Sequence, residues 1–284
     1  MKKLVKKVVG FVLAAISVFA FASCGGKYKL TVGKEYVVAP SQLDALMKLD
    51  KGEADVAVID SVMAGYYTST GDYASKMQIV DGLVFAEESY GIAGKKGNKA
   101  LMSKINEALI AIRTTDYTEL VTEYNLTSSV ALTETTADTY AGATDNSWDK
   151  VVESKKLVIG YTVFAPIAYE EDGALTGFDI ELAKKTVAYL NTKYNVEIEA
   201  DFVEIDWSTK EAKLEDGTID LVWNGMTITD ERAEQMCISV PYLFNKQVAV
   251  ILKSDASKYT TKESMADAIV TAETGSAGES VIKD

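Results

Sequence analysis

Short apolar runs alternate with longer amphipathic segments along most of the chain. The runs have the length of buried strands and lie at residues 35–39, 54–60, 89–94, 156–162, 196–205, 219–225, 247–254 and 268–272. The segments with helical spacing lie at residues 41–52, 99–113, 115–125, 178–195, 208–217 and 262–268. Ser41 is a candidate N-cap and Gly52 a candidate helix stop. This alternation predicts an α/β fold class, in which mainly parallel sheets are flanked by helices.

The final predicted strand passes through a turn at Gly275 and Ser276 into a helix that begins near Gly278. A strand that feeds a helix is half of a βαβ unit, and the unit needs another parallel strand. We therefore expect this strand to pair with a strand from elsewhere in the chain.

Residues 127–147 differ from the sequence on either side, because they are rich in Thr, Ser, Ala and Asp and have no apolar period. This composition predicts a linker. On its two sides, KLDKGEADVAVID from Lys48 and KLEDGTIDLVWNG from Lys213 share one pattern of helix end, glycine, acid and strand. The order of helix, glycine, acid and strand is common in α/β proteins, so chance is an alternative explanation of this match. Asp60 and Asn224 lie at the carboxyl ends of these strands, where open α/β sheets bind ligands.

The first 23 residues have the pattern of a secretion signal, with a basic start, an apolar run and small residues before Cys24. The sequence FASC followed by GG resembles the lipobox of bacterial lipoproteins, in which the cysteine is lipidated and becomes the new N-terminus. The alternative is an ordinary cleaved signal with a cysteine by chance. On the first interpretation the protein is anchored by lipid to the extracytoplasmic face of the cell membrane. Cys237 is then alone, and we expect it to be a small buried core residue.

Charge and composition exclude several classes of function. The 284 residues include 29 basic and 42 acidic side chains and no histidine, and the net charge is −13. The absence of histidine argues against His-based triads and His-ligated zinc. The acidic balance argues against nucleic acid as a partner. No motif points to a metal or another cofactor, and we expect none.

Four motifs after Lys156 occur together in a characteristic order: LVIGYTVFAPIAY, LTGFDIELAKK, DWSTKEAKLEDGTIDLVWNGMTITDER and SVPYLFNKQVAV. In this order the chain from Trp148 to Asp284 resembles the polar amino acid binding proteins of ABC importers, solute-binding protein family 3. The resemblance implies a two-lobed, periplasmic-binding-protein-like (type II) fold. It also implies that the protein closes on one amino acid and delivers it, as a monomer, to an ABC transporter permease.

The segment from about Gly33 to Leu126 resembles the remaining, second half of the same family. The stretch GKEYVVAPSQLDALMKLDKGEADVAVIDS would normally follow AETGSAGESVIKD, but here it stands near the amino end. The chain therefore resembles a circular permutant, which exposed loops close in space can tolerate. Residues 28–87 plus 253–284 would form a discontinuous lobe B, and residues 88–126 plus 148–252 would form lobe A. Residues 127–147 would join the family's usual termini, and residues 84–94 and 247–254 would be the hinge strands.

The resemblance also implies a set of ligand contacts. Arg232 matches the arginine that grips the α-carboxylate of the ligand, a group that suits a planar guanidinium. Thr227, Asn224 and Gly225 match strand-end positions that bind the same carboxylate, and Ser276 would add a hydroxyl and helix N-terminal N–H groups. For Arg232 alone, a surface arginine in an acidic run is the alternative.

Asp60 matches the carboxylate that pairs with the α-ammonium of the ligand, and its alternative role is a helix N-cap. Phe164 and Trp207 match aromatic positions that sandwich the ligand side chain, with core packing as the alternative. Some basic amino acid binders of the family carry a carboxylate where this chain has Tyr161 and Thr162. Tyr161 is a candidate ligand contact at this position, and the departure argues against a dedicated lysine or arginine pocket and leaves neutral polar ligands such as glutamine or cystine open.

Two other interpretations remain at the level of the sequence. A few relatives of this fold are enzymes of the dehydratase or cell-wall lytic type, but the chain has no histidine and its motifs contain no clear acid–base pair. The other interpretation is a non-functional fused gene product whose lobe B cannot assemble. Against it, both pieces of lobe B are present.

Overall fold

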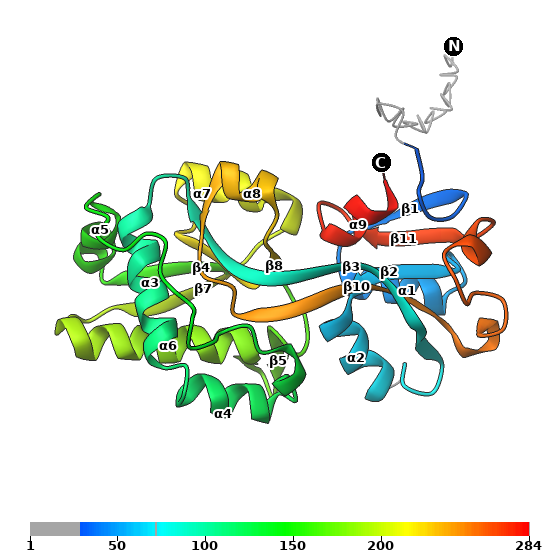
Figure 1. Ribbon diagram of the computed structural model, residues 1–284, viewed down its shortest axis with the longest axis horizontal. Coiled ribbons are helices and arrows are strands. Elements are labelled where there is room, and N and C mark those ends of the chain that lie inside the picture. Colours follow the sequence, from blue (N-terminus) through cyan, green and yellow to red (C-terminus); the bar gives the residue numbers. More distant parts are fainter. Residues whose placement is uncertain (1–28, 72, 284) are drawn as a thin grey trace, which may run out of the picture.

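A computed structural model describes residues 29–71 and 73–283 of the chain. The predicted signal at residues 1–23 and the predicted lipidation site at Cys24 lie outside the described residues. The described part is an α/β structure in which one twisted sheet runs from end to end and helices cover its faces (Figure 1). The fold class predicted from the alternation of strands and helices is confirmed.

The main sheet has nine strands in the order β1-β11-β2-β10-β3-β8-β4-β7, and β9 pairs with β3. Its outer strands pair in parallel, whereas β10 and β3 in the middle are antiparallel to each other and to their outer neighbours. The strands are β1 (Glu35–Ala39), β2 (Val56–Asp60), β3 (Met77–Lys95), β4 (Lys156–Tyr161), β7 (Glu199–Glu204), β8 (Leu221–Thr227), β9 (Met236–Ile238), β10 (Leu243–Leu252) and β11 (Ile269–Glu273). A separate hairpin joins β5 (Tyr169–Glu171) to β6 (Ala174–Thr176).

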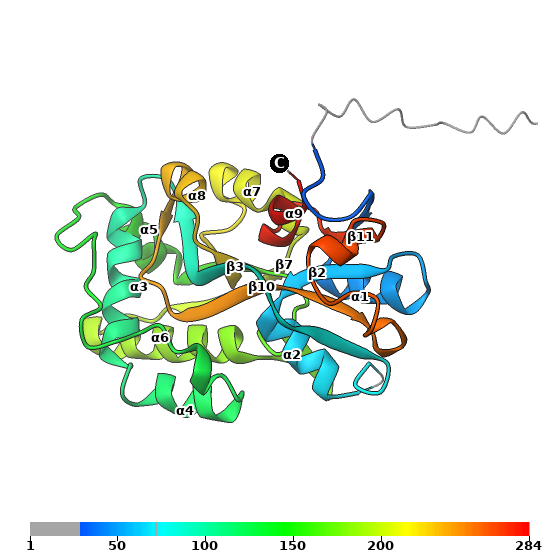
Figure 2. The ribbon, with the colours of Figure 1, turned by 45° about the vertical axis from the view of Figure 1, so that its right-hand side comes forward.

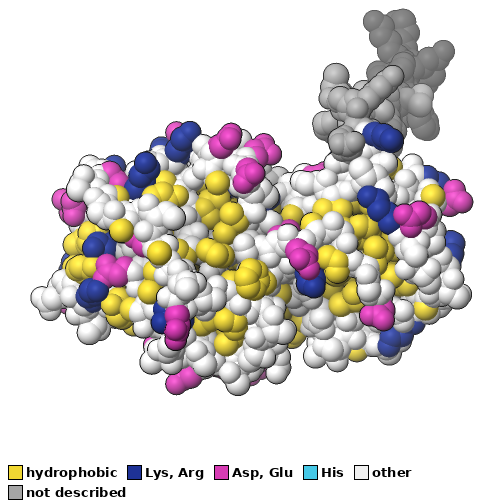
Figure 3. Space-filling model, viewed as in Figure 1, with side chains coloured by type: hydrophobic (Ala, Val, Ile, Leu, Met, Phe, Trp, Pro, Cys, Tyr) yellow, Lys and Arg dark blue, Asp and Glu magenta, His cyan; other side chains and the backbone are white. Residues whose placement is uncertain are grey.

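The molecule has two lobes that are joined by the long strands β3 and β10 (Figures 1 and 2). The small lobe contains β1, β2 and β11 with α1 (Gln42–Asp50), α2 (Ser61–Ser69) and α9 (Ala277–Ile282). The large lobe contains β4, β7 and β8 with α3 (Lys99–Ala111), α4 (Asp116–Glu123), α5 (Ser147–Ser154), α6 (Phe178–Tyr194), α7 (Lys210–Asp216) and α8 (Asp230–Gln235). The space-filling view narrows between the lobes, and acidic and basic side chains are scattered over the face that it shows (Figure 3).

Strands from the two ends of the described chain meet in the small lobe. β1 pairs in parallel with β11, in a register that sets Glu35 opposite Ile269 and Ala39 opposite Glu273. The backbone N–H of Thr31 donates to the carbonyl of Ile282 at 2.9 Å, and its hydroxyl donates to the carbonyl of Val281 at 2.6 Å. The expectation that the last strand pairs with a strand from elsewhere in the chain is confirmed.

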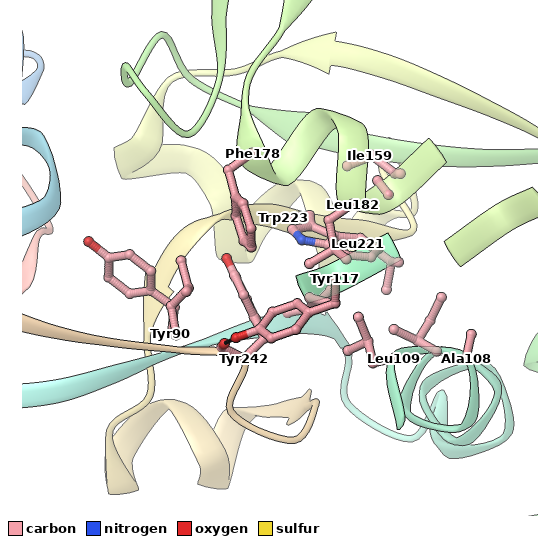
Figure 4. Close-up of a cluster of buried hydrophobic side chains, with 14 of the residues drawn as sticks. Tyr90, Ala108, Leu109, Tyr117, Ile159, Phe178, Leu182, Leu221, Trp223 and Tyr242 are labelled. Atoms are coloured by element: carbon pink, nitrogen blue, oxygen red, sulfur yellow. Dashed lines mark hydrogen bonds between the residues drawn. The ribbon is translucent and has the colours of Figure 1, made fainter. Parts of the chain in front are cut away.

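Aromatic side chains fill the core of the large lobe (Figure 4). The rings of Phe178 and Tyr242 stack with their centroids 6.3 Å apart, and the Tyr117 hydroxyl donates to the Tyr242 carbonyl at 2.5 Å. Trp223, in the middle of β8, is fully buried in the same cluster. Cys237 is a free, buried thiol of this core, as the sequence predicts.

The segment at residues 127–147 is attached to the large lobe by side-chain hydrogen bonds. Asp145 and Ser147 accept from the backbone N–H groups of Ala100 and Leu101 at 2.8 and 2.9 Å, and thereby satisfy free donors of the first turn of α3. Asp138 accepts from the Asn106 amide at 2.6 Å. The composition of this segment indicates a connection without regular structure, but its short polar side chains fix its path.

Two predicted elements differ from the structure. The helix expected at residues 262–268 is a single 3₁₀ turn, Glu263–Met265. The strand expected at residues 89–94 is the end of the 19-residue β3, whose earlier part has mixed exposure and therefore no long apolar run. The N-cap predicted at Ser41 is confirmed, because its hydroxyl accepts from the Asp44 N–H at 3.0 Å.

Candidate ligand-binding site

A narrow cavity of about 20 Å³ lies between the two lobes, at the carboxyl ends of β2, β8 and β11. It is lined by Gln42, Asp60, Thr162, Val163, Phe164, Trp207, Asn224, Gly225, Thr227, Arg232, Glu273, Ser276 and Ala277. The lining includes every ligand contact predicted from the sequence except Tyr161. Residues more than 200 positions apart therefore meet at one site, because the carboxyl ends of β2 and β11 in one lobe face the carboxyl end of β8 in the other.

Tyr161 packs away from the cavity, in a small apolar cluster with Ala168 and Ile180. Its neighbour Thr162 lines the cavity instead. Successive side chains along an extended chain point to opposite faces, so only one of the two can face a ligand. The prediction of Tyr161 as a ligand contact therefore differs from the structure, which places Thr162 at the cavity instead.

Arg232 links the two lobes at one edge of the cavity. Its Nη1 donates to the carbonyl of Thr227 at 2.7 Å in the large lobe, and its Nη2 donates to the carbonyl of Gly275 at 3.0 Å in the small lobe. A guanidinium has five N–H donors, so these two bonds leave others for an anion in the cavity. The half-buried position of the side chain strengthens such an interaction, since the surroundings screen it less than water does.

Asp60 faces the cavity from the other lobe, in a network of side-chain amides. Its carboxylate accepts from the amides of Gln42 and Asn245, and from Gln247 Nε2 at 2.9 Å. Although Asp60 stands at the N-cap position of α2, its carboxylate forms no capping hydrogen bond. The Asp60 side chain therefore accepts hydrogen bonds from side-chain amides and does not cap α2, which was the alternative role.

Glu88 shares this amide network with Asp60. Its Oε1 accepts from Gln247 Nε2 at 2.8 Å, from Asn245 Nδ2 at 2.5 Å and from the Thr227 hydroxyl at 3.0 Å. Burial, and then repulsion by Glu88, raise the pKa of Asp60 well above its usual range. A cation placed in the cavity would relieve this repulsion, so the pair favours a positively charged group.

The polar groups of Asn224 and Gly225, near the end of β8, form hydrogen bonds with other groups of the protein. The Asn224 amide and the Thr162 hydroxyl lie 2.7 Å apart. The N–H of Gly225 donates to Asp179 Oδ2 at 2.8 Å and therefore does not point into the cavity. Gly225 has φ +59°, and a Cβ there would lie 2.7 Å from Phe164, so the position requires glycine to keep that ring at the cavity wall.

The hydroxyl of Ser276 is also engaged within the protein. It donates to the carbonyl of Glu273 at 2.7 Å and accepts from the N–H of Glu279 at 3.1 Å, which makes it the N-cap of α9. Ser276 is buried and lines the cavity, so a ligand contact would add to this capping role.

Phe164 and Trp207 form aromatic walls of the cavity and are both nearly buried. Phe164 packs edge-on against Tyr90, with ring centroids 6.5 Å apart. The Nζ of Lys210 lies 4.8 Å from the centre of the Trp207 ring. Both aromatic residues therefore line the cavity and also pack in the hydrophobic core.

Two polar residues of the lining, Gln42 and Glu273, are absent from the sequence-based prediction. Gln42 bonds Asp60 with both ends of its amide, since its Oε1 also accepts from the Asp60 N–H at 2.9 Å. Glu273 is the last residue of β11 and is buried. Its position directly after an apolar strand resembles that of Asp60 after β2, and this was the one signal in the sequence that could have found it.

Asp179 is buried beneath the cavity floor and is not part of its lining. Its Oδ2 accepts from Tyr242 at 2.7 Å and from the Gly225 N–H. Burial raises its pKa to about 7. The group holds the backbone of Gly225 from outside the cavity and is not itself part of the lining, so its role is structural.

The chain is similar to known proteins over part of its length. Residues 157–274 match the bacterial extracellular solute-binding proteins, family 3. The L-cystine-binding protein TcyJ of Escherichia coli K12 is 29% identical over 119 residues, which are 41% of this chain and 42% of that protein. The cyclohexadienyl dehydratase of Pseudomonas aeruginosa is 28% identical over 132 residues, which are 46% of this chain and 47% of the enzyme. The chain thus spans less than half the length of these curated relatives.

A solved structure is similar over a comparable length. It is an ABC uptake transporter substrate-binding protein from Streptococcus pneumoniae with bound histidine. It is 42% identical, with 32% of this chain and 35% of that chain covered and a TM-score of 0.28. Within residues 29–71 and 73–283, no helix has the length and apolar character that a membrane crossing requires.

Proposed function

Because residues 157–274 match family 3 of the bacterial extracellular solute-binding proteins, we propose that this protein binds a polar amino acid and delivers it to an ABC importer. The two lobes would close on the amino acid as a hinge closes, with β3 and β10 as the hinge strands. The closed form would then be the state that a transporter permease recognises.

The pairing of Arg232 with Asp60 across one cavity carries the proposal. A free amino acid presents a carboxylate and an ammonium on the same carbon. The cavity presents a guanidinium from the large lobe and a carboxylate from the small lobe. Each lobe therefore holds one of the two charges, and a ligand that satisfies both stabilises the closed arrangement.

We also propose that the chain is a circular permutant with the lobe boundaries predicted from its sequence. Lobe B would be residues 28–87 plus 253–284, and lobe A residues 88–126 plus 148–252. The parallel pairing of β1 with β11 and the bonds from Thr31 to Val281 and Ile282 support this order. The attachment of residues 127–147 to α3 is consistent with a segment that joins two older termini.

The site of action follows from the family and from the amino end of the sequence. We propose that the protein acts outside the cytoplasm as a monomer, held to the membrane by a lipid on Cys24. The described chain leaves the small lobe at Lys29, so such an anchor would tether that lobe.

A dehydratase is the alternative function, because one relative is a cyclohexadienyl dehydratase and because Glu273 places an acid in the cavity. Against it, the chain contains no histidine. Mass spectrometry of the ligand after long incubation with the protein separates the two functions. We expect the amino acid to be recovered unchanged, and turnover would overturn the transport function.

A thermal-shift screen over the twenty amino acids and cystine tests the proposed function. A ligand at a hundredfold excess over its Kd adds about 2.7 kcal/mol to the free energy of unfolding, which corresponds to roughly 5 °C or more in Tm. We expect this shift for one ligand class. The proposal fails if no amino acid raises the Tm.

Two variants connect the screen to the site. Arg232→Ala and Asp60→Asn should each abolish the ligand-dependent shift, because each removes one of the two charges that recognise the α-carbon groups. Arg113→Ala is the matched control, since Arg113 is the other arginine of the sequence and lies half-buried on the large lobe, outside the cavity lining. Binding that survives both site variants would refute the assignment of the site.

A further inference from the structure

We propose that the bound amino acid carries a basic side chain, and that the carboxylate of Glu273 receives the cationic end of that side chain. The inference rests on the proposed function and specifies its ligand. It is carried by the position of Glu273 in the cavity, by the charges that remain after the α-carbon groups are paired, and by the separate engagement of Lys210.

Glu273 belongs to the cavity by both position and burial. It ends β11, it is only 5% exposed, and it lines the same space as Asp60 and Arg232. Gln42 lies between the two carboxylates, because its amide bonds Asp60 and also faces Glu273. The acid therefore lies beyond the point where the α-ammonium would bind.

The α-carbon groups of an amino acid would pair with two of the three ionisable side chains that line the cavity, and one carboxylate would remain. Arg232 would pair with the α-carboxylate of the ligand and Asp60 with its α-ammonium. Glu273 is the remaining ionisable group among the lining residues. A buried carboxylate needs a partner or a proton, and a cationic side chain supplies the partner.

The nearest lysine, Lys210, attracts the Glu273 carboxylate but is more than 4.0 Å from it and forms its ion pair elsewhere. Lys210 forms its ion pair with Glu211 at 2.9 Å, and its Nζ also donates to the carbonyls of Trp207 at 3.3 Å and Gly275 at 3.5 Å. Among the described residues, no basic nitrogen lies within 4.0 Å of the Glu273 carboxylate. The position open to a cation is therefore the cavity itself.

The electrostatic surroundings are consistent with this assignment. Burial raises the pKa of Glu273 to about 8; Lys210 lowers it, Asp206 and Asp44 raise it, and the Gln42 amide lowers it. At pH 7 the empty site therefore holds a proton on Glu273. A cationic side chain would displace this proton, so binding of a basic amino acid should release one proton more than binding of a neutral one.

Calorimetry tests the inference directly on the full protein. Lysine, ornithine, arginine and glutamine are titrated at pH 7 in buffers of different ionisation enthalpy. We expect a basic ligand to bind at least about tenfold more tightly than glutamine, with an additional release on the order of one proton. Glutamine corrects for protons released by Asp60, which every amino acid would contact.

Glu273→Gln should weaken the basic ligand by about 30-fold or more and remove the additional proton release, while glutamine binding changes little. Glu35→Gln is the control, because Glu35 is exposed on β1, beside β11 and outside the cavity. The comparison among ligands on the unaltered protein decides the question even if the variant does not fold.

Each outcome separates the inference from the function on which it rests. If glutamine or another neutral amino acid binds as tightly as the basic ones, or if Glu273→Gln leaves the preference intact, the inference is wrong and the binding function stands. If no amino acid binds, the proposed function and the inference both fail.

Discussion

Asp179 is a single residue whose environment makes stability depend on pH. It is fully buried at the start of α6, where Oδ2 accepts from Tyr242 and Gly225 and Oδ1 has no partner among the described residues. Its pKa is about 7 in the folded protein, against 3.8 for an ordinary aspartate. The folded state therefore holds the proton more strongly, and the free energy of unfolding falls as pH rises from about 4 to 7.

Asp179→Asn should flatten this dependence, because an amide cannot ionise and can still accept from Gly225. We expect the slope to decrease by about 1 kcal/mol per pH unit between pH 5 and 7, with the variant at least as stable as the natural protein at pH 8. Urea unfolding of both proteins at several pH values measures this slope and their stability at pH 8. Asp81→Asn, at an exposed position of β3, is the control, and equal slopes for all three proteins would contradict the expectation.

Single residues also show how far the sequence predicts the site. Arg232 and Asp60 could be identified because each stands in a motif with fixed spacing. Gln42 and Glu273 could not, because their place in the cavity lining depends on which strand ends meet in space. Tyr161 shows a third limit: a motif fixes a region, but the side that each residue faces depends on the backbone direction after the strand.

At the scale of elements, the first turn of α3 depends on a residue outside the helix. Asp145 accepts from the Ala100 N–H at 2.8 Å and from the Ser147 N–H at 3.1 Å. Asp145→Ala should reduce the free energy of unfolding by about 1 kcal/mol, since it removes a helix cap. Asp138→Ala tests the other attachment, and Glu134→Ala, at an exposed position of the same segment, is the control. Chemical denaturation that finds no loss in either variant would mean that residues 127–147 are not part of the stable fold.

The elements predicted from periodicity agree with the structure where one face is clearly apolar, as in α1, α3 and α6. The prediction fails where pairing with distant strands, and not the local sequence period, determines the secondary structure. β3 contains polar and exposed positions along its first half and is held extended by β10. α2 was missed because its sequence SVMAGYYTS is nearly uniform around the helix, so no apolar stripe appears.

At the scale of the whole molecule, the proposed permutation predicts that the chain can be reopened elsewhere. Lys283 and Leu30 form an antiparallel bridge, so a short glycine–serine connection can join them. A chain joined there and opened between Thr136 and Ala137 should unfold cooperatively and bind the same amino acid as the parent. A chain joined there but opened inside β3 at Gly94, which is buried, is the control that should fail. Loss of binding in the first chain, while the parent binds, would refute the permutation.

The strand order of the small lobe sets the order in which its sheet can be completed. β11 lies between β1 and β2 in the sheet, yet it is the last of the strands along the chain. The large lobe is one continuous stretch and needs neither end of the chain. β1 and β2, however, have no direct pairing and must wait for β11, which lies about 200 residues after β2. Until β11 is inserted, the edges of β1 and β2 that it covers are unpaired, so its insertion is the step that closes them to other chains.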